Sequence, residues 1–170
     1  MIDIKTFFKP VPETVFISGG ISGIGSELAK AFLAAGSNIV ILDCQHDEPA
    51  MAEMRAVCVS KHQKIKSYAV DIRDPVIVCE AVNQAVSEVG RPNLAINSAG
   101  ILRTAPFKEI AYDTFKMVVD INLMGSRNFA AAVAPYMQAG DHLALIASLA
   151  GVCGTYTQAA YAASKFGVVG

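Results

Sequence analysis

The feature that most constrains this chain is a regular alternation of short apolar runs with longer amphipathic segments. The short runs hold four to six residues, mostly Val, Ile, Leu and Ala, and are apolar on both faces. Such runs fit parallel strands covered by helices on both sides. They predict strands at Thr14–Ser18, Asn38–Asp43, Ser67–Val70, Leu94–Asn97 and His142–Ala147.

The longer segments carry apolar residues at helical spacing. Pro49 and Pro75 fall in the first turns of two of them, where proline is tolerated. Strands that alternate with helices form βαβ units, so the predicted class is α/β with a mostly parallel sheet. The predicted helices are Gly23–Ala35, Asp47–Lys61, Asp74–Val89, Glu109–Met137 and a last one from Gln158 onward.

We expect one domain, because 170 residues suit a single unit at roughly 150 residues per domain. Residues 14–170 would form its body. Residues 1–13 would be an N-terminal tail whose Phe7 and Phe8 pack back onto that body. Hydrophobic residues make up 53% of the chain and the net charge is −1, which excludes a disordered chain.

Charge and hydropathy narrow the function classes. With a pI near 6.3, binding of nucleic acid through bulk charge is not expected. No uninterrupted apolar run reaches the ~18 residues that a membrane span needs. The N-terminus is charged and lacks the pattern of a secretory signal, so a cytoplasmic location is the default expectation.

The cysteines and histidines form no metal-binding pattern. The sequence has no CxxC pair, and no cysteine stands at zinc-ligand spacing to a histidine. We therefore expect no metal site, and four reduced, partly buried thiols at Cys44, Cys58, Cys79 and Cys153.

A glycine-rich turn follows the first predicted strand. It reads Ser18-Gly19-Gly20-Ile21-Ser22-Gly23-Ile24-Gly25 and leads into a predicted helix. Glycines let a backbone approach a pyrophosphate, which the free N–H groups and dipole of the helix N-terminus then hold. Glycines alone are equally compatible with an ordinary strand–helix turn, so this interpretation depends on its surroundings.

Asp43 supplies that context. It ends the second predicted strand, eighteen positions after Gly25. A carboxylate there accepts hydrogen bonds from the adenine ribose hydroxyls and repels a 2′-phosphate. No Arg or Lys stands in the glycine turn or directly after Asp43, at Cys44, Gln45 or His46. These features favour NAD over NADP, with a simple strand-end turn residue as the alternative interpretation of Asp43.

Tyr161 and Lys165 stand four positions apart in the last predicted helix and so share one face. A lysine ammonium there stabilises a tyrosinate and lowers the tyrosine pKa from ~10, which suits Tyr161 to general acid/base catalysis. Such a pair on its own is common on solvated helix faces. Ser148 and Asn97–Gly100 follow the fifth and fourth predicted strands, at the rim where open α/β sheets bind ligands.

In these motifs and their order, residues 14–170 resemble the short-chain dehydrogenase/reductase family. The glycine motif matches as Gly19-x-x-x-Gly23-x-Gly25, with Ser18 where Thr is more usual. The family's Asn-Asn-Ala-Gly element appears as Asn97-Ser98-Ala99-Gly100, with one departure at Ser98. The resemblance implies a Rossmann-type, doubly wound parallel sheet with strand order 3-2-1-4-5.

The resemblance also implies roles for individual residues. Tyr161 would pass the proton, and Ser148 would hydrogen-bond the substrate oxygen. Lys165 would bind the nicotinamide ribose, and Asn122 would hold Lys165 through a water. Asp71 and Ile72 match the element that contacts adenine. The residues implied for NAD binding are Gly19, Ser22, Gly23, Ile24, Gly25, Asp43, Asp71, Ile72, Asn97, Ala99, Gly100, Tyr161 and Lys165.

The implied function is hydride transfer between NAD(H) and an alcohol/carbonyl pair. Family members continue past the Tyr-x-x-x-Lys helix with two more strands and a substrate-binding segment. This chain therefore looks C-terminally incomplete: a fragment, a short isoform or the ordered part of a longer protein. The alternative function is a non-catalytic, truncated dinucleotide-binding or interaction module.

Substrate and assembly are less constrained. The residues after Gly100 and after Ser148 form a mainly apolar wall, which suits a steroid, a fatty alcohol or a small cyclic alcohol equally well. Small residues on the long helix could support a contact between subunits or pack on the sheet, and the resemblance favours a homo-oligomer. These small residues are Ala130, Ala131, Ala132 and Ala134.

Overall fold

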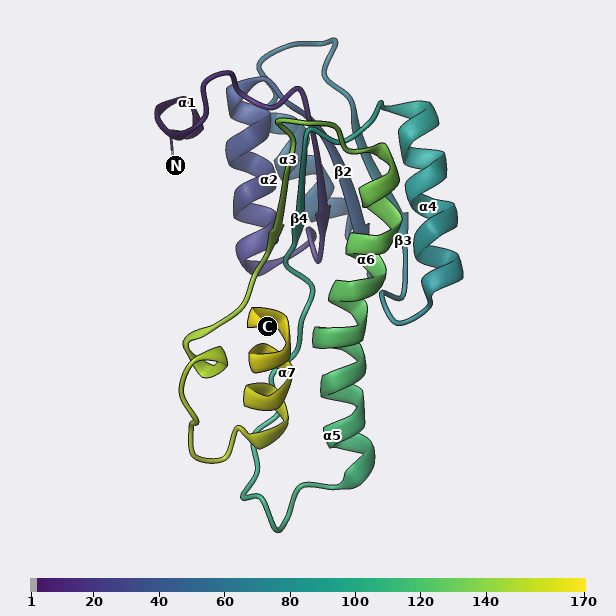
Figure 1. Ribbon diagram of the computed structural model, residues 1–170. Helices are drawn as coiled ribbons and strands as arrows, with labels where there is room; N and C mark the ends of the chain where they lie inside the picture. The colour runs from purple at the N-terminus through teal and green to yellow at the C-terminus, as the bar shows by residue number, and fades with distance from the viewer. Residues whose placement is uncertain (1–2) are drawn as a thin grey trace.

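The computed structural model describes residues 3–170 and places five parallel strands in one sheet (Figure 1). The predicted α/β class is confirmed, and so is the implied strand order, β3-β2-β1-β4-β5. The third strand begins two residues earlier than predicted, and the fifth ends two residues earlier. The strands are β1 (Thr14–Ser18), β2 (Asn38–Asp43), β3 (Ile65–Ala69), β4 (Leu94–Asn97) and β5 (His142–Leu145).

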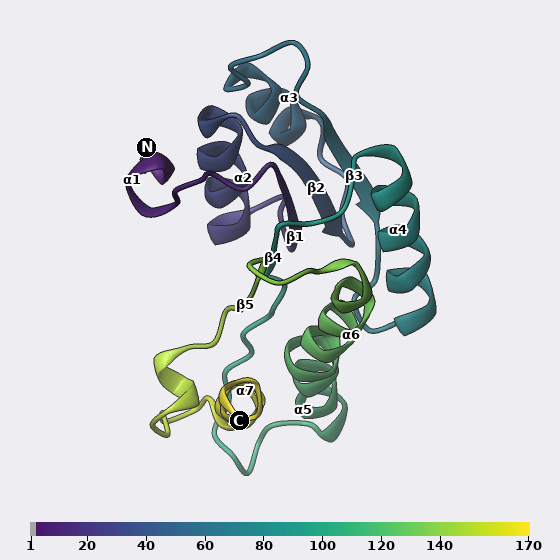
Figure 2. The same ribbon diagram turned by 45° about the horizontal axis from the view of Figure 1, so that its top comes forward.

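Helices cover both faces of the sheet (Figure 2). α2 (Gly23–Ala35) and α3 (Glu48–Ala56) lie on one face, and α4 (Pro75–Glu88) and α6 (Gly125–Val133) lie on the other. Successive strand residues point to opposite faces. Ile17 therefore packs among the side chains of α2 and α3, whereas Phe16 packs among those of α4 and α6.

The two outer strands, β3 and β5, are less buried than predicted. β1 and β4 are buried throughout, but β3 is only partly buried and all four residues of β5 are exposed. Leu143 and Leu145 of β5 are 41% and 36% exposed. The expectation that helices cover every strand on both sides is wrong for β5, because the last helix, α7 (Ala159–Val169), lies beyond the end of this strand rather than over its face (Figure 1).

Local sequence accounts for two of the helix starts. The Asp47 side chain caps α3 by accepting a hydrogen bond from the N–H of Ala50 at 3.1 Å. The Asp74 side chain caps α4 in the same way, accepting from the first-turn N–H groups. Asp and Pro at these positions are strong signals for the beginning of a helix.

The long helix predicted for residues 109–137 is interrupted. It consists of α5 (Tyr112–Val119), a π-helical turn η1 (Asp120–Met124), α6, and a 3-10 turn η2 (Ala134–Tyr136). π-helical turns are rare and often mark functional sites. Here the turn carries Asn122, which is fully buried.

The N-terminal segment forms a short helix, α1 (Ile4–Phe7), whose Ile4 is buried. The Phe8 ring packs edge-on against Phe32 of α2, with 5.5 Å between ring centroids. Phe7 is 73% exposed, so only one of the two phenylalanines returns to the body as expected. No helix within residues 3–170 is long and apolar enough to cross a membrane.

All four cysteines are free thiols. The expectation of partial burial holds for Cys58 alone, since Cys44, Cys79 and Cys153 are exposed. Within the described residues, no three His, Cys, Asp or Glu side chains cluster to hold a metal ion.

Candidate active site

A cavity of about 460 Å³ opens at the carboxyl ends of the central strands. Nine of the residues implied for NAD binding line it: Gly19, Ser22, Gly23, Ile24, Asp43, Asp71, Ile72, Ala99 and Gly100. From the sequence, the other lining residues were not assigned to cofactor binding: Leu42, Cys44, Gln45, Val70, Arg73, Ser98, Ile101 and Ile121.

Two glycines bring the turn after β1 into backbone contact with its neighbours. Gly19 has a φ of +66°, and a Cβ there would lie 2.6 Å from the backbone of Ala99. A Cβ on Gly25 would lie 2.1 Å from the carbonyl oxygen of Gly19. Only glycine fits such approaches. Gly25 therefore shapes the turn from beneath and does not line the cavity.

The N-terminus of α2 faces this cavity. Gly23 has a φ of +55°, and apart from its chain neighbours and the backbone of its own helix, no described atom lies within 4 Å of the place its Cβ would occupy. The Ser22 side chain makes no capping hydrogen bond to the first turn. A helix of 13 residues with such an uncapped start presents N–H groups and a positive dipole end to an anion.

Asp43 has a structural role beside its predicted one. Its two carboxylate oxygens accept hydrogen bonds from the N–H groups of Ile21 and Gln45, each at 3.1 Å. Asp43 thus braces the glycine turn from the end of β2. A carboxylate has about four acceptor positions, so two hydroxyl donors can still be accommodated.

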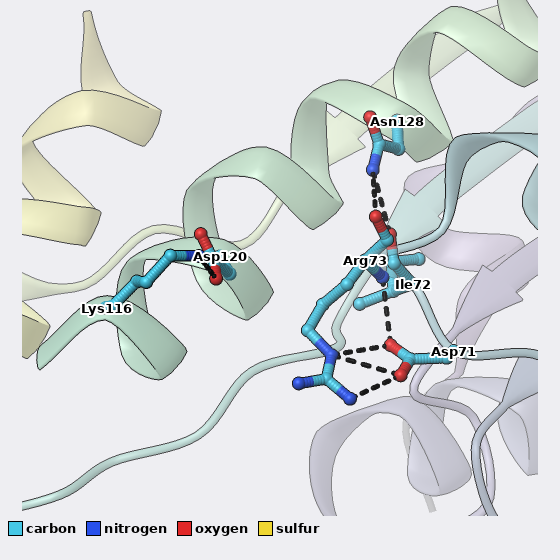
Figure 3. Close-up of polar contacts among 6 residues, drawn as sticks. All are labelled: Asp71, Ile72, Arg73, Lys116, Asp120 and Asn128. Carbon is cyan, nitrogen blue, oxygen red and sulfur yellow. Dashed lines mark hydrogen bonds and ion pairs between the residues drawn. The ribbon is translucent and has the colours of Figure 1, made fainter. Parts of the chain in front are cut away.

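Arg73 is a cation in the cavity wall that the sequence interpretation overlooked. Its Nε lies 2.9 and 3.0 Å from the two carboxylate oxygens of Asp71, and its backbone N–H donates to the same carboxylate (Figure 3). This guanidinium lowers the pKa of Asp71. Asn128 of α6 holds the turn by donating to the carbonyl oxygens of Ile72 and Arg73 (Figure 3).

Lys165 lies inside the molecule on α7. It is 5% exposed, and its Nζ donates a hydrogen bond to the carbonyl oxygen of Ile146 at 2.6 Å. The same Nζ lies 5.7 Å from the ring centroid of Tyr161, one helical turn earlier. Burial lowers the pKa of Lys165, because the ammonium loses hydration.

Asn122 joins this pair from the π turn. Its Oδ1 accepts from the N–H of Ile101 at 2.8 Å, and its Nδ2 donates to the carbonyl oxygen of Ile101 at 2.9 Å. A Cβ on Gly100 would lie 3.2 Å from Asn122 Oδ1 and 3.8 Å from Lys165 Nζ. Gly100 is thus the shared wall between the cavity and the predicted catalytic residues.

The remaining two predicted residues are placed differently. Ser148 begins a 3-10 turn, η3 (Leu149–Gly151), and its Oγ accepts from the N–H of Ala150 at 3.2 Å. Within the described chain, no hydrogen bond joins Ser148 to Tyr161. Asn97 is 2% exposed and lies beneath the cavity without lining it.

Comparison of sequences identifies the family to which this fold belongs. The profile of the family described as "short chain dehydrogenase" matches residues 13–170. This chain belongs to the short-chain dehydrogenase family. The predicted resemblance is therefore confirmed over nearly the whole chain.

Curated short-chain dehydrogenase relatives are about 30% identical to the chain. Oxidoreductase UcpA of Escherichia coli (strain K12) is 30% identical over 165 residues, which cover 95% of this chain and 62% of that protein. The 2-dehydro-3-deoxy-L-rhamnonate dehydrogenase (NAD(+)) of Sphingomonas sp. (strain SKA58) is 33% identical over 157 residues, covering 91% and 61% respectively.

Solved short-chain dehydrogenase structures superpose well. Carveol dehydrogenase from Mycobacterium avium in complex with NAD gives a TM-score of 0.83 at 25% identity, covering 92% of this chain and 62% of that one. NAD+-bound xylitol dehydrogenase gives 0.83 at 28% identity, covering 92% and 61%. The chain thus spans 61–62% of the length of these relatives.

Proposed function

We propose that this chain carries the catalytic core of an enzyme that transfers hydride between NAD(H) and an alcohol/carbonyl pair. One observation supports this most directly: Gly100 lines the cavity and also lies next to the side chains of Asn122 and Lys165. A dinucleotide in the cavity would therefore end next to the proposed acid/base group.

The cavity residues fit a dinucleotide. The open side of Gly23 and the uncapped start of α2 leave room and N–H donors for the pyrophosphate. Asp43 would accept the ribose hydroxyls, and Asp71 and Ile72 would meet adenine. When bound, the nicotinamide ring supplies the carbon that donates or accepts the hydride.

We propose NAD rather than NADP as the cofactor. Asp43 places a negative charge where a 2′-phosphate would sit. Of the described residues that line the cavity, Arg73 is the one cation, and it is already paired with Asp71. Two structural neighbours, carveol dehydrogenase and xylitol dehydrogenase, are bound to NAD in their crystal structures, which agrees with the proposal.

Tyr161 would carry the proton. In the oxidation direction, its phenolate takes the proton of the substrate hydroxyl, and the hydride leaves the carbon that bears this hydroxyl. The Lys165 ammonium beside the ring stabilises the phenolate. Ser148 Oγ accepts from Ala150, so its own O–H proton is free to be donated to the substrate oxygen.

A second candidate is a binding module without turnover, which the exposed face of β5 favours. The two are separated by assaying the complete natural polypeptide for NADH binding by fluorescence and for NADH consumption with a panel of ketones and aldehydes. We expect saturable binding together with turnover of at least one carbonyl. Binding without turnover across the panel would support the module instead.

A further inference from the structure

A buried chain of hydrogen bonds begins under the glycine turn. The Ser18 hydroxyl donates to Asn97 Oδ1, which links β1 to β4. Asn97 Nδ2 donates to Ser126 Oγ on α6 at 2.7 Å. Ser126 Oγ in turn donates to the backbone carbonyl oxygen of Asn122 at 2.5 Å, so it braces the π turn from one helical turn below.

The chain continues to the proposed catalytic helix. Asn122 Nδ2 donates to Ser164 Oγ at 3.0 Å, and Ser164 Oγ donates to the carbonyl oxygen of Tyr161 at 2.7 Å. The five residues whose side chains form this chain of hydrogen bonds are each 3% exposed or less: Ser18, Asn97, Ser126, Asn122 and Ser164. Hydrogen bonds, joined through the residues that make them, thus connect Ser18, at the start of the glycine turn, with the backbone of Tyr161.

Two serines link successive hydrogen bonds in this chain of hydrogen bonds. Ser126 and Ser164 each accept one hydrogen bond and donate another, so removing either hydroxyl leaves a buried donor and a buried acceptor without that partner. Neither serine lines the cavity. Their effect on a reaction would therefore pass through Asn122 and Tyr161.

We infer that Ser126 and Ser164 are positioning residues for the proposed hydride transfer, an inference that rests on the proposed function. Ser126 fixes the π turn that holds Asn122, and Ser164 ties Asn122 to the helical turn that carries Tyr161. A misplacement of 1 Å at a reacting group can cost on the order of 10²-fold in rate. Loss of the hydroxyl of either serine therefore slows the proton step more than it weakens cofactor binding.

The test uses Ser126→Ala and Ser164→Ala in the complete natural polypeptide. We expect kcat to fall about tenfold or more in each variant, while KM for NADH stays within about twofold. We also expect the pH profile of kcat to shift, because the geometry around the acid/base group changes. Ser126→Thr keeps the hydroxyl and should recover most of the kcat that Ser126→Ala loses.

Two serines elsewhere provide matched controls. Ser37 is 1% exposed and donates to the carbonyl oxygen of Pro12 at 2.6 Å, far from the site in the fold. Ser87 is exposed on α4 and bonds the carbonyl oxygen three residues earlier, as Ser164 does. Ser37→Ala should lower the thermal midpoint and Ser87→Ala should not, and both should leave kcat and its pH profile unchanged.

The outcomes separate the two claims. Unchanged kcat and pH profile in both site variants, or an equal loss of kcat in Ser37→Ala, overturns the positioning role while the proposed function stands. A natural polypeptide that binds NADH but turns over no carbonyl overturns the proposed function, and the positioning role with it. NADH binding in each variant shows whether it has folded.

Discussion

Lys165 Nζ lies 5.7 Å from the ring centroid of Tyr161 and is anchored to the carbonyl oxygen of Ile146 at 2.6 Å. This places an ammonium between the end of β5 and the phenol. The ammonium is almost fully buried, and burial lowers its pKa. Among the residues that the structure describes, no carboxylate pairs with this ammonium. A buried, unpaired cation destabilises the folded chain, so the site is built at a cost in stability.

Replacing Lys165 by Met tests that cost. The folded-state pKa lies below the unfolded value of 10.5, so the penalty is complete below the folded pKa and disappears as pH rises toward 10.5. We expect Lys165→Met to raise the thermal midpoint by about 2–4 °C at pH 7, equivalent to ~1 kcal/mol in the free energy of unfolding. The difference in midpoint between the variant and the wild type should be smaller at pH 10. A midpoint below wild type at pH 7 would contradict this account, and exposed Lys61→Met is the control.

Asp43 is predicted to set the choice of cofactor. NADH should bind at least about tenfold more tightly than NADPH, roughly 1.4 kcal/mol, because the carboxylate repels a 2′-phosphate. Replacing Asp43 by Ala and Cys44 by Arg together should narrow or reverse that preference. Fluorescence titration with both cofactors measures it, and a wild-type preference for NADPH would be incompatible with the assignment.

Arg73 gives a sharper control on the same question. Its guanidinium is held by Asp71, so its charge is already compensated within the cavity wall. Arg73→Leu should therefore change the NADH/NADPH affinity ratio by less than about twofold. A larger loss of NADPH affinity than of NADH affinity would show that Arg73 reaches the 2′-phosphate.

The exposed edge of β5 predicts association. Leu143 and Leu145 are exposed on an outer strand, whose free edge is a template for pairing with another chain. Residues 1–170 expressed alone should aggregate or need a partner, as seen by light scattering. Leu143→Lys should reduce the association and Val59→Lys, at an exposed site elsewhere, should not. A monodisperse, active monomer would refute this prediction.

Much of this fold could be predicted from local sequence. Apolar runs gave β1, β2 and β4 at their observed bounds, and Asp47 and Asp74 marked two helix starts. Nine of the cavity-lining residues were expected. Gly19 and Asp43 followed from glycine spacing and a strand end, where local sequence and tertiary position coincide, whereas Asp71 and Ile72 were implied only by the family resemblance.

The rest depends on contacts between distant segments. The π turn forms where Asn122 bonds both backbone groups of Ile101, a partner that helical periodicity does not reveal. The helix predicted to reach Lys61 ends at Ala56. Gln63, from outside it, accepts from the N–H groups of the turn that follows and donates to the carbonyl oxygen of Leu33. Arg73 stands in an Asp-x-Arg sequence after β3, but the spacing alone does not reveal that the guanidinium lies in the cavity wall and pairs with Asp71.

Tyr161→Phe in the complete natural polypeptide tests the central claim most directly. The substitution keeps the ring and removes the hydroxyl that would carry the proton. We predict that turnover falls by about 10²-fold or more, in line with general acid/base catalysis, while NADH affinity changes little. Near-normal turnover by Tyr161→Phe, with NADH binding intact, would contradict the assignment of Tyr161 as the acid/base group.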